Sequence, residues 1–391
     1  MILHDPSLNM AFRDYGIMLP IAPDRASRVA EFLGKDGALS SFPGPVLDIP
    51  GALGLLGEAG SRPVLDRADL ERVHQRDFVA ALYGDPGRGA PAEGRPDTMS
   101  GLEGALLYAY ELIDSRGRPH RYEPDRALKP LPALFDTILA QVGGTYLACR
   151  LALGQIGAPP GAAGFCYYLG GGMHHARYDS GSGFCLVNDI MIAARKIQAE
   201  GRARLIWIVD VDAHKGDGTA ELVRFARNRG GPGEPGGIGA RGVYGPVLTL
   251  SVHMASGWPL DAESLAAARP GRAPLVQSDI DIGIEAGEEA AYVPRLKEGL
   301  CGMEKLSAGA SGPMPDLAIV VDGADPYEHD GLPSSGLLRL SLDQCLARDR
   351  LIYTFLRERH IPSAWIMAGG YGDRAWEPPA RFLEGLPEPR R

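Results

Sequence analysis

The sequence has 391 residues, of which 45% are hydrophobic and 23% are charged. A chain of this length and composition can bury a sizeable core, as expected of a soluble globular protein. Its 49 acidic and 40 basic residues give a formal net charge of −9 without a Lys/Arg-rich run. This balance argues against nucleic acid as a direct partner, because phosphate binding needs a basic face.

The cysteine pattern and the hydropathy both indicate an intracellular protein. The five cysteines are widely spaced and form no CxxC motif, which is typical of reduced thiols in a cytosolic compartment. Residues 1–16 lack a basic segment followed by an apolar run, so we expect no signal peptide. No stretch of about 18 apolar residues is present. We therefore expect a cytoplasmic location and no membrane partner.

Glycine and proline gather in two places, residues 85–96 and 229–242. Such segments are typical of surface loops or insertions. The sequence shows no internal repeat and no clean domain boundary. We therefore predict a single catalytic domain over residues 1–391, with loop insertions near 85–130 and 229–242.

Five short apolar runs predict strands that are buried on both faces. In chain order they are 164–169, 205–211, 247–253, 317–321 and 363–368. Helical patterns lie between them, for example over 188–200 and 342–357. Strands that alternate with helices predict an α/β fold, a three-layer αβα arrangement with a mostly parallel sheet. Such sheets bind ligands at the carboxyl ends of their strands.

Polar or conformationally special residues lie at the end of each of these five runs or just after it. In chain order they are His174 and His175, then Asp210, Asp212, His214 and Asp217, then Ser251 and His253, then Asp322 and Asp325, and finally Gly369, Gly370 and Tyr371. Because the carboxyl ends of parallel strands meet at one edge, we expect these residues to converge on one rim.

Asp212, His214 and Asp325 are the candidate metal ligands. Asp212 and His214 stand at i and i+2, so on an extended strand end their side chains would point the same way. With Asp325 they give three N/O ligands and leave positions open, the arrangement of a catalytic rather than a structural Zn²⁺. Fe²⁺ is an alternative ion. The competing interpretation, that Asp212 and His214 only cap the next helix, accounts for none of the other polar strand ends.

The adjacent His174 and His175 follow three glycines. Near a metal, one of them could take a proton from water and return it to a leaving amine. Asp210 and Asp217 are available to orient them. The hydroxyl of Tyr371 could stabilise the oxyanion of a tetrahedral intermediate. The alternative interpretation is that the two histidines belong to a turn without a catalytic role and that Tyr371 is an ordinary, partly buried tyrosine.

These residues resemble the histone deacetylase family, including its bacterial acetoin-utilisation and acetylpolyamine amidohydrolase branches. The resemblance covers most of the chain and rests on the order and spacing of GGGMHHARYDSGSGFCLVNDI, DVDAHKGDGT, LSVHMASGWP, DGADP and AGGYG. It implies an arginase/deacetylase-type fold with a parallel sheet of about eight strands. It also implies hydrolysis of an N-acyl amine, usually acyl-lysine. Residues 323–362 resemble a class IV-like branch more closely than class I.

The resemblance also implies roles for the metal and proton-transfer residues. Asp212, His214 and Asp325 match the ligands of one Zn²⁺ per chain. His175 matches the histidine that acts as general base and then general acid. His174 matches its electrostatic partner.

Further matches surround these residues. Asp210 and Asp217 match the acidic partners of the two histidines, and Tyr371 matches the oxyanion tyrosine. Phe184 and Trp258 match the aromatic pair that walls the substrate tunnel.

Substrate contacts and a second ion are implied as well. Gly183, Gly370 and Arg25 match residues that line the substrate channel, Arg25 below the metal. A structural K⁺ would bind the backbone carbonyls and side chains of a set of residues near the strand ends. That set is Asp210, Asp212, His214, Ser251 and Val252.

Three departures from the family pattern concern the substrate end of the site. Lys215 stands where many members carry a second histidine, and Trp258 stands where phenylalanine is commoner, which predicts a narrower tunnel mouth. Residues 86–130 do not match class I, so the carboxylate that grips the substrate backbone is not identified.

Two other functions compete with a deacetylase. A binuclear ureohydrolase of the arginase type needs carboxylates at the positions of Gly216 and Val320, which this chain lacks. A non-catalytic acyl-amine binding protein would be expected to have lost a ligand or Tyr371. Within the deacetylase reading, acyl-lysine of a protein or peptide and small acylated amines such as acetylpolyamines both stay open as substrates. Acyl length and oligomeric state stay open too.

Overall fold

The computed structural model describes most of the chain. The described residues are 1–35, 45–58, 64–85, 101–114, 116–154, 164–228, 245–261, 275–310 and 314–386. The predicted loop over 229–242 and the glycine- and proline-rich segment that follows Asp85 lie outside them.

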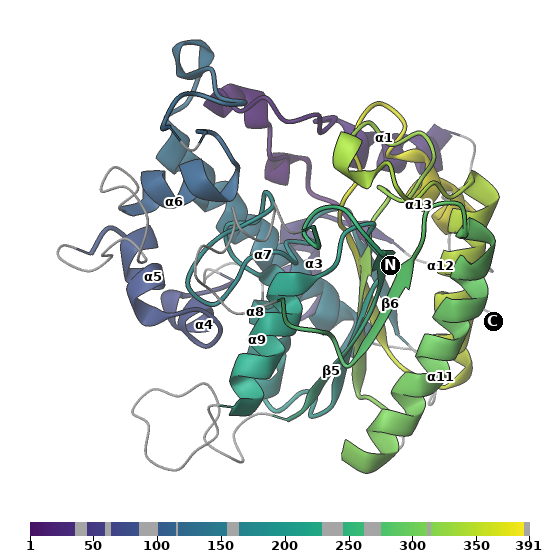
Figure 1. The fold of residues 1–391 in the computed structure, drawn as a ribbon. Helices are drawn as coiled ribbons and strands as arrows, with labels where there is room; N and C mark the ends of the chain where they lie inside the picture. The colour runs from purple at the N-terminus through teal and green to yellow at the C-terminus, as the bar shows by residue number, and fades with distance from the viewer. Residues whose placement is uncertain are drawn as a thin grey trace.

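An eight-stranded sheet lies at the centre of this part of the molecule (Figure 1), and every neighbouring pair of strands is parallel. The strand order is β2-β1-β3-β8-β7-β4-β5-β6. The strands are β1 (Ile2–Leu3), β2 (Val46–Leu47), β3 (Phe165–Tyr168), β4 (Ile206–Asp210), β5 (Val247–Met254), β6 (Ile280–Ile284), β7 (Leu317–Asp322) and β8 (Ser363–Met367). The predicted parallel α/β fold is therefore confirmed.

Helices cover both faces of the sheet (Figure 1). One layer contains α7 (Leu134–Leu153), α8 (Asp189–Ala199) and α9 (Asp217–Asn228). The opposite layer contains α1 (Arg25–Lys35), α11 (Tyr292–Ala310), α12 (Leu342–Glu358) and α13 (Glu377–Glu384). Outside α7 lie α3 (Ile49–Leu55), α4 (Arg67–Glu71), α5 (Arg76–Leu82) and α6 (Gly101–Ala109). The fold has the three predicted layers.

Successive residues of the central strands face two different hydrophobic cores. In β4, Ile206 and Ile208 pack with residues of α7 and α8, whereas Trp207 and Val209 pack with residues of α11 and α12. All four side chains are buried. This alternation follows from the two-residue period of a strand, and burial on both faces explains why the predicted runs are apolar throughout.

All five predicted strands are confirmed as β3, β4, β5, β7 and β8. The sequence reading did not name β1, β2 or β6. The first two have only two residues each, and β6 is a partly exposed edge strand. The described part of the predicted insertion near 85–130 contains α6, whose buried residues belong to the core beside α7.

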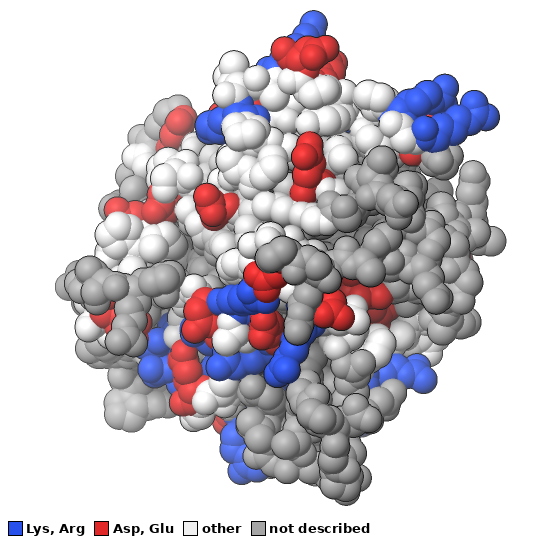
Figure 2. All heavy atoms as spheres, turned by 90° about the vertical axis from the view of Figure 1, so that its left-hand side faces the viewer, with Lys and Arg blue, Asp and Glu red and all other residues white. Residues whose placement is uncertain are grey.

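The described surface is of mixed charge. On the face drawn in Figure 2, basic and acidic side chains lie beside one another among uncharged residues. Within the described ranges, none of the helices combines the length and the apolar character that a membrane crossing requires.

Candidate active site

The three predicted metal ligands meet at the carboxyl ends of β4 and β7. The Nδ1 atom of His214 lies 3.2 Å from Asp212 Oδ1 and 2.9 Å from Asp325 Oδ2. One ligand atom from each residue lies within 4.8 Å of the other two, and all three residues are buried. One detail differs from the expectation: β4 ends at Asp210, so the turn after the strand, and not the strand itself, brings Asp212 and His214 together.

Backbone N–H groups fix the orientation of these carboxylates. Asp212 Oδ1 accepts a hydrogen bond from the N–H of His214 at 3.0 Å, and Asp325 Oδ1 accepts one from Ala213 at 2.9 Å. The N–H of Gly369, after β8, donates to Asp212 Oδ2 at 2.9 Å. A side chain at position 369 would collide with this oxygen. The candidate ligands are therefore oriented by backbone N–H groups from two strand ends, those of β4 and β8.

The electrostatics of this triad favour a bound cation. Burial alone would lower the pKa of His214, but hydrogen bonds and charges from Asp212 and Asp325 outweigh it and raise the pKa to about 10. Burial and the charge on Asp212 raise the pKa of Asp325 to about 7. Two buried carboxylates so close together need positive charge between them, which a proton or a metal ion can supply.

The two histidines lie beside the triad, each with its own carboxylate partner. His174 Nδ1 is 2.7 Å from Asp210 Oδ2, and His175 Nδ1 is 2.8 Å from Asp217 Oδ1. Arg177 donates to the other oxygen of Asp217 at 2.6 Å. The two imidazole rings are 3.9 Å apart at their centroids. The predicted pairing of both histidines with Asp210 and Asp217 is thus what the structure contains.

The two imidazoles differ in their affinity for a proton. Burial lowers the pKa of His174, but the charges of Asp210 and Asp212 outweigh burial and raise it to about 9. Burial and the charge on His174 lower the pKa of His175 to about 3, although Asp217 acts in the opposite direction. His175 is therefore neutral near pH 7. Because Nδ1 bonds to Asp217, Nε2 is the nitrogen that can accept a proton.

The histidine loop is anchored to the start of α8. The carboxylate of Asp189 accepts hydrogen bonds from the N–H groups of Gly172 and Met173 at 3.0 and 2.7 Å. The side chain of Asn188 caps α8 through Met191 N–H and donates to the carbonyl of Ala176. These contacts hold the chain on both sides of the histidine pair.

His74, which was not predicted, supports the same loop from between α4 and α5. Its Nδ1 lies 2.7 Å from the carbonyl oxygen of Arg177, and its Nε2 accepts the N–H of Asn188 at 3.0 Å. A ring that donates at Nδ1 and accepts at Nε2 must be neutral. Burial lowers the pKa of His74 from 6.5 to about 4, although hydrogen bonds to the carbonyls of Arg177 and Tyr178 oppose the shift.

This arrangement makes the fold sensitive to acid. The unfolded chain protonates His74 below pH 6.5, whereas the folded chain resists until about pH 4, so stability is lost as the pH falls through this window. The difference between the two pKa values corresponds to about 3 kcal/mol of stability, because one pKa unit is worth about 1.4 kcal/mol.

We expect His74→Asn to show a shallower fall in the free energy of unfolding between pH 6.5 and 4 than wild type. Urea titrations at several pH values measure it, with the exposed His120→Asn as the matched control. Equal slopes in wild type and His74→Asn would refute this account.

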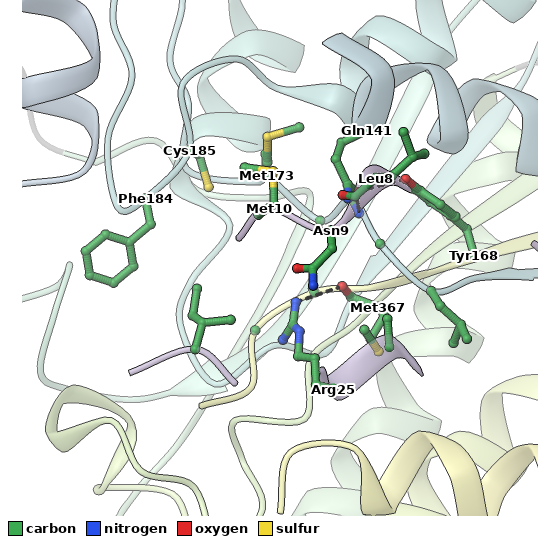
Figure 3. Close-up of a pocket in the computed structure, with 18 of the residues that line it drawn as sticks. Leu8, Asn9, Met10, Arg25, Gln141, Tyr168, Met173, Phe184, Cys185 and Met367 are labelled. Carbon is green, nitrogen blue, oxygen red and sulfur yellow. Dashed lines mark hydrogen bonds between the residues drawn. The ribbon is translucent and has the colours of Figure 1, made fainter. Parts of the chain in front are cut away.

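Tyr371 lies after β8, with its side chain between two pockets. The first of them, the inner chamber, borders Asp212 and His214 and is lined by a set of apolar and polar side chains that Figure 3 shows. Those labelled there are Leu8, Asn9, Met10, Arg25, Gln141, Tyr168, Met173, Phe184, Cys185 and Met367. Burial and the charges of Asp325 and Asp212 raise the pKa of Tyr371 well above 10. Its hydroxyl therefore keeps its proton and can donate a hydrogen bond.

Arg25 points into this inner chamber (Figure 3), as the sequence predicted. Its guanidinium donates to the carbonyl oxygen of Gly370 at 3.0 Å and to that of Met367 at 3.5 Å. Burial lowers the pKa of Arg25, while the charges of Tyr371 and nearby carboxylates act against this. Arg25 thus ties the turn that carries Tyr371 to the start of α1.

The outer pocket reaches the ligand triad from the other side. His175, Gly183, Phe184, His214 and Tyr371 line both cavities, so the two meet at the candidate catalytic residues. The outer pocket is completed by Glu111, Arg121, Trp258, Leu332 and Ser334.

Trp258 packs directly against the histidines of the site. Its ring lies edge-on to His175 at 4.5 Å and to His214 at 5.5 Å between centroids. Gly183 has a positive φ of 52°, and a side chain there would collide with both Trp258 and His175. Phe184 lies 6.3 Å from Tyr371 on the other wall. The predicted aromatic pair therefore lines the approach to the triad.

The side chains of two polar strand-end residues, His253 and Asp322, bond to groups outside the triad and the histidine pair. The side chain of His253, inside β5, bonds to the carbonyl of Met254. Asp322 accepts hydrogen bonds from Tyr167 and from Arg348 at 2.7 and 2.6 Å. The expectation that all of these residues converge on one rim was therefore wrong for these two.

Arg348 and Asp330 support the site and were missed by the sequence reading. The guanidinium of Arg348 donates to the carbonyls of Val211 and Gly323 at 3.0 and 2.9 Å, which joins the two ligand-bearing turns. Asp330 accepts the N–H of Tyr371 at 2.7 Å. Both residues lie in polar helical or loop segments without a distinctive pattern, so only the folded chain reveals them.

The residues of the predicted K⁺ site lie at the end of β4, in the turn after it, and on the neighbouring β5. Asp210 on β4 stands opposite Ser251 on β5. The Ser251 hydroxyl oxygen is buried and has no hydrogen-bond partner among the described residues. A buried oxygen of this kind is available to a cation.

Comparison with known proteins decides the family. The profile of the histone deacetylase domain matches residues 20–381. The chain belongs to the histone deacetylase family. The assignment to a class IV-like branch stays a prediction.

Several relatives within and around the family were identified. An uncharacterized protein of Picosynechococcus sp. is 32% identical over 234 residues, which cover 60% of this chain and 62% of that protein. The acetoin utilization protein AcuC of Staphylococcus aureus is 54% identical over 212 residues, which cover 54% of this chain and 46% of AcuC. The chain thus matches less than two thirds of the length of these relatives. The structure of an acetylpolyamine aminohydrolase from Burkholderia pseudomallei has the same fold, with 20% identity, a TM-score of 0.60 and coverage of 98% of this chain and 97% of that one.

Proposed function

We propose that this protein is a metal-dependent amidohydrolase that removes the acyl group from an N-acylated amine. One observation carries the proposal: a neutral His175 and a protonated Tyr371 line both pockets together with His214, which is clustered with Asp212 and Asp325. Amide hydrolysis needs a base for water, an acid for the amine and a donor for the oxyanion.

The triad fits one divalent ion, Zn²⁺ in the first place and Fe²⁺ as the alternative. Two carboxylates and one imidazole are N/O ligands of the kind that catalytic zinc sites use. Such an ion, when bound, polarises the amide carbonyl and makes water more acidic. A second ion has no ligands here, because a side chain at Gly216 would collide with Asp210, and Val320 is buried in the apolar core. These features argue against a binuclear ureohydrolase.

The remaining steps belong to the chain's own side chains. His175 Nε2 takes the proton of the attacking water and later delivers it to the leaving amine, while Asp217 holds the ring. His174, which Asp210 keeps protonated, supplies positive charge beside the developing anion. Tyr371 donates its hydroxyl hydrogen to the oxyanion. The products are the free amine and a carboxylate.

We further propose that K⁺ binds at Asp210, Asp212, His214, Ser251 and Val252. The Ser251 hydroxyl oxygen, which is buried and has no hydrogen-bond partner among the described residues, supports this proposal.

The substrate is proposed to carry an alkyl chain between its amide and its far end. Phe184 and Trp258 wall the outer pocket, and aromatic walls stabilise a methylene chain by apolar contact. Acyl-lysine of a peptide or protein is one candidate. Small acylated amines are the other, which the acetylpolyamine aminohydrolase fold relative supports.

Tyr371→Phe tests the mechanism with minimal change in shape. We expect the variant to keep its metal content and its melting temperature but to lose about 10²–10³-fold in kcat on a fluorogenic acetyl-lysine substrate, the usual effect of removing one oxyanion donor. Metal analysis by mass spectrometry and steady-state kinetics measure both quantities. The exposed Tyr83→Phe is the control. Turnover near that of wild type would remove Tyr371 from the mechanism.

The same assay tests the function itself. The metal-loaded wild-type protein is expected to release acetate from at least one acetylated amine. Bound metal without turnover of acetyl-lysine peptide, acetyl-lysine, acetylputrescine or acetylspermidine would favour an acyl-amine binding protein.

A further inference from the structure

The mouth of the outer pocket carries one acidic and one basic side chain, Glu111 and Arg121. The guanidinium NH1 of Arg121 donates to Glu111 Oε2 at 3.0 Å. About a third of the Arg121 side chain and 42% of that of Glu111 are exposed. Among the described lining residues, these two contribute the only carboxylate and the only guanidinium of this pocket. The mouth of the pocket therefore carries both a negative and a positive charge.

A short hairpin holds this pair in place. Glu111 follows α6, and the N–H of His120 donates to the carbonyl of Leu112, so the chain returns to bring Arg121 beside Glu111. The carbonyl of Arg121 in turn accepts the N–H of Met18 at 2.9 Å. Both charged residues are thus anchored through their backbones, which leaves the side chains free to exchange partners.

Backbone strain is concentrated at this mouth. Five described non-glycine residues have positive φ, and three of them are Glu111 (54°), Arg121 (55°) and Phe184 (64°). Arg121 contacts both of the others, because its guanidinium donates to Glu111 and lies 5.5 Å from the centroid of the Phe184 ring. Left-handed conformations are uncommon for such residues and gather at ligand-binding sites.

We infer that Glu111 and Arg121 select the free, zwitterionic head of an ω-N-acylated diamino acid such as Nε-acetyl-lysine. The inference rests on the proposed function and names its substrate class. The acylated end reaches His175 and Tyr371, and the methylene chain passes Phe184 and Trp258. The α-ammonium group then meets Glu111, and the α-carboxylate meets the guanidinium fork of Arg121.

Charge complementarity favours this ligand over the other two candidates. An acetylpolyamine brings only positive charge to the mouth, which Arg121 repels. An acyl-lysine inside a peptide brings neutral amides to the mouth, and these offer Glu111 and Arg121 no charged partners in place of each other. A zwitterion offers each side chain a new partner of opposite charge, and a carboxylate can accept two of the five N–H donors of arginine in a bidentate manner.

The test compares kcat/KM of the metal-loaded protein on Nε-acetyl-lysine, Nε-acetyl-lysine amide, N-acetylcadaverine, acetylspermidine and an acetyl-lysine peptide. N-acetylcadaverine lacks only the α-carboxylate. We expect Nε-acetyl-lysine to exceed each of the others by about 10- to 100-fold, the range of one or more charge-assisted hydrogen bonds.

Arg121→Gln is expected to bring kcat/KM for Nε-acetyl-lysine down towards that for N-acetylcadaverine. Glu111→Gln should lower kcat/KM for every substrate with an α-ammonium group. Arg118→Gln is the matched control, because Arg118 lies in the same hairpin and pairs with Asp114 outside the pocket. An exposed ion pair stabilises a fold little, so these variants should fold.

Three results would overturn the inference. Equal or better turnover of N-acetylcadaverine or acetylspermidine would indicate a cationic amine site, and better turnover of the peptide would indicate a protein substrate. An Arg121→Gln variant that keeps the full preference for Nε-acetyl-lysine would exclude Arg121 as its cause. In all three cases the proposed function stands. Failure to hydrolyse any acyl amine would contradict the function as well.

Discussion

Asp212→Asn is expected to abolish metal binding and to lower kcat/KM by about 10⁴-fold, since polarising the carbonyl and activating water are each worth several kcal/mol. The amide of Asn keeps the shape of the side chain but removes one of the two negative charges that flank His214. Metal analysis per chain and steady-state kinetics on an acetylated amine measure the two effects. The control is Asp136→Asn, an exposed carboxylate at the start of α7.

A stability measurement separates this effect from misfolding. The charge on Asp212 is one reason why the pKa of Asp325 is raised to about 7, after burial. Removing that charge relieves this repulsion, but it also takes a partner from the protonated His174 and His214, whose charges outweigh burial and hold the pKa of Asp212 far below its usual value. With a chelator present, Asp212→Asn should therefore still melt in one cooperative transition, at or below the temperature of wild type, whereas added Zn²⁺ should raise the melting temperature of wild type only. A variant that binds stoichiometric metal would contradict the ligand assignment.

His175→Gln is expected to lower kcat by about 10²–10⁴-fold, the usual contribution of general acid–base catalysis. Glutamine can still hydrogen-bond to Asp217, but it has no nitrogen that accepts a proton near neutral pH. Metal content should stay at the level of wild type, because His175 is not one of the clustered ligands.

The exposed His329→Gln is the control for the loss of a histidine. Kinetics at substrate saturation and metal analysis on the same preparations provide the comparison. If His175→Gln kept most of its kcat, another group would have to act as the base, and His174 would be the nearest candidate.

Much of the fold could be predicted from the sequence because the central strands are buried on both faces. Runs such as 205–211 are short and apolar, which favours a strand buried on both faces, and the structure confirms them. The short strands β1 and β2 have two residues each, so they lack the length on which a hydrophobic pattern depends. Their place in the sheet comes from tertiary packing.

The residues of the candidate site also fall into those that the sequence predicted and those that it did not. Residues that follow strands directly, such as Asp212 and Asp325, were predicted because parallel strands end at one edge. His74 and Arg348 act through backbone carbonyls from distant helical segments, which no spacing reveals. Asp322 follows the rule of position and yet turns to Arg348, because a buried arginine requires a carboxylate partner.

The backbone N–H groups that hold the carboxylates of Asp212 and Asp325 bear on the order of folding and metal binding. Ala213, His214 and Gly369 orient Asp212 and Asp325 through bonds that form when the sheet forms. In small zinc domains, by contrast, the metal supplies the folding energy. We therefore expect the folded chain to form before an ion binds, so that one ion could replace another without unfolding. The ion in the proposed site would then depend on which metals surround the folded protein.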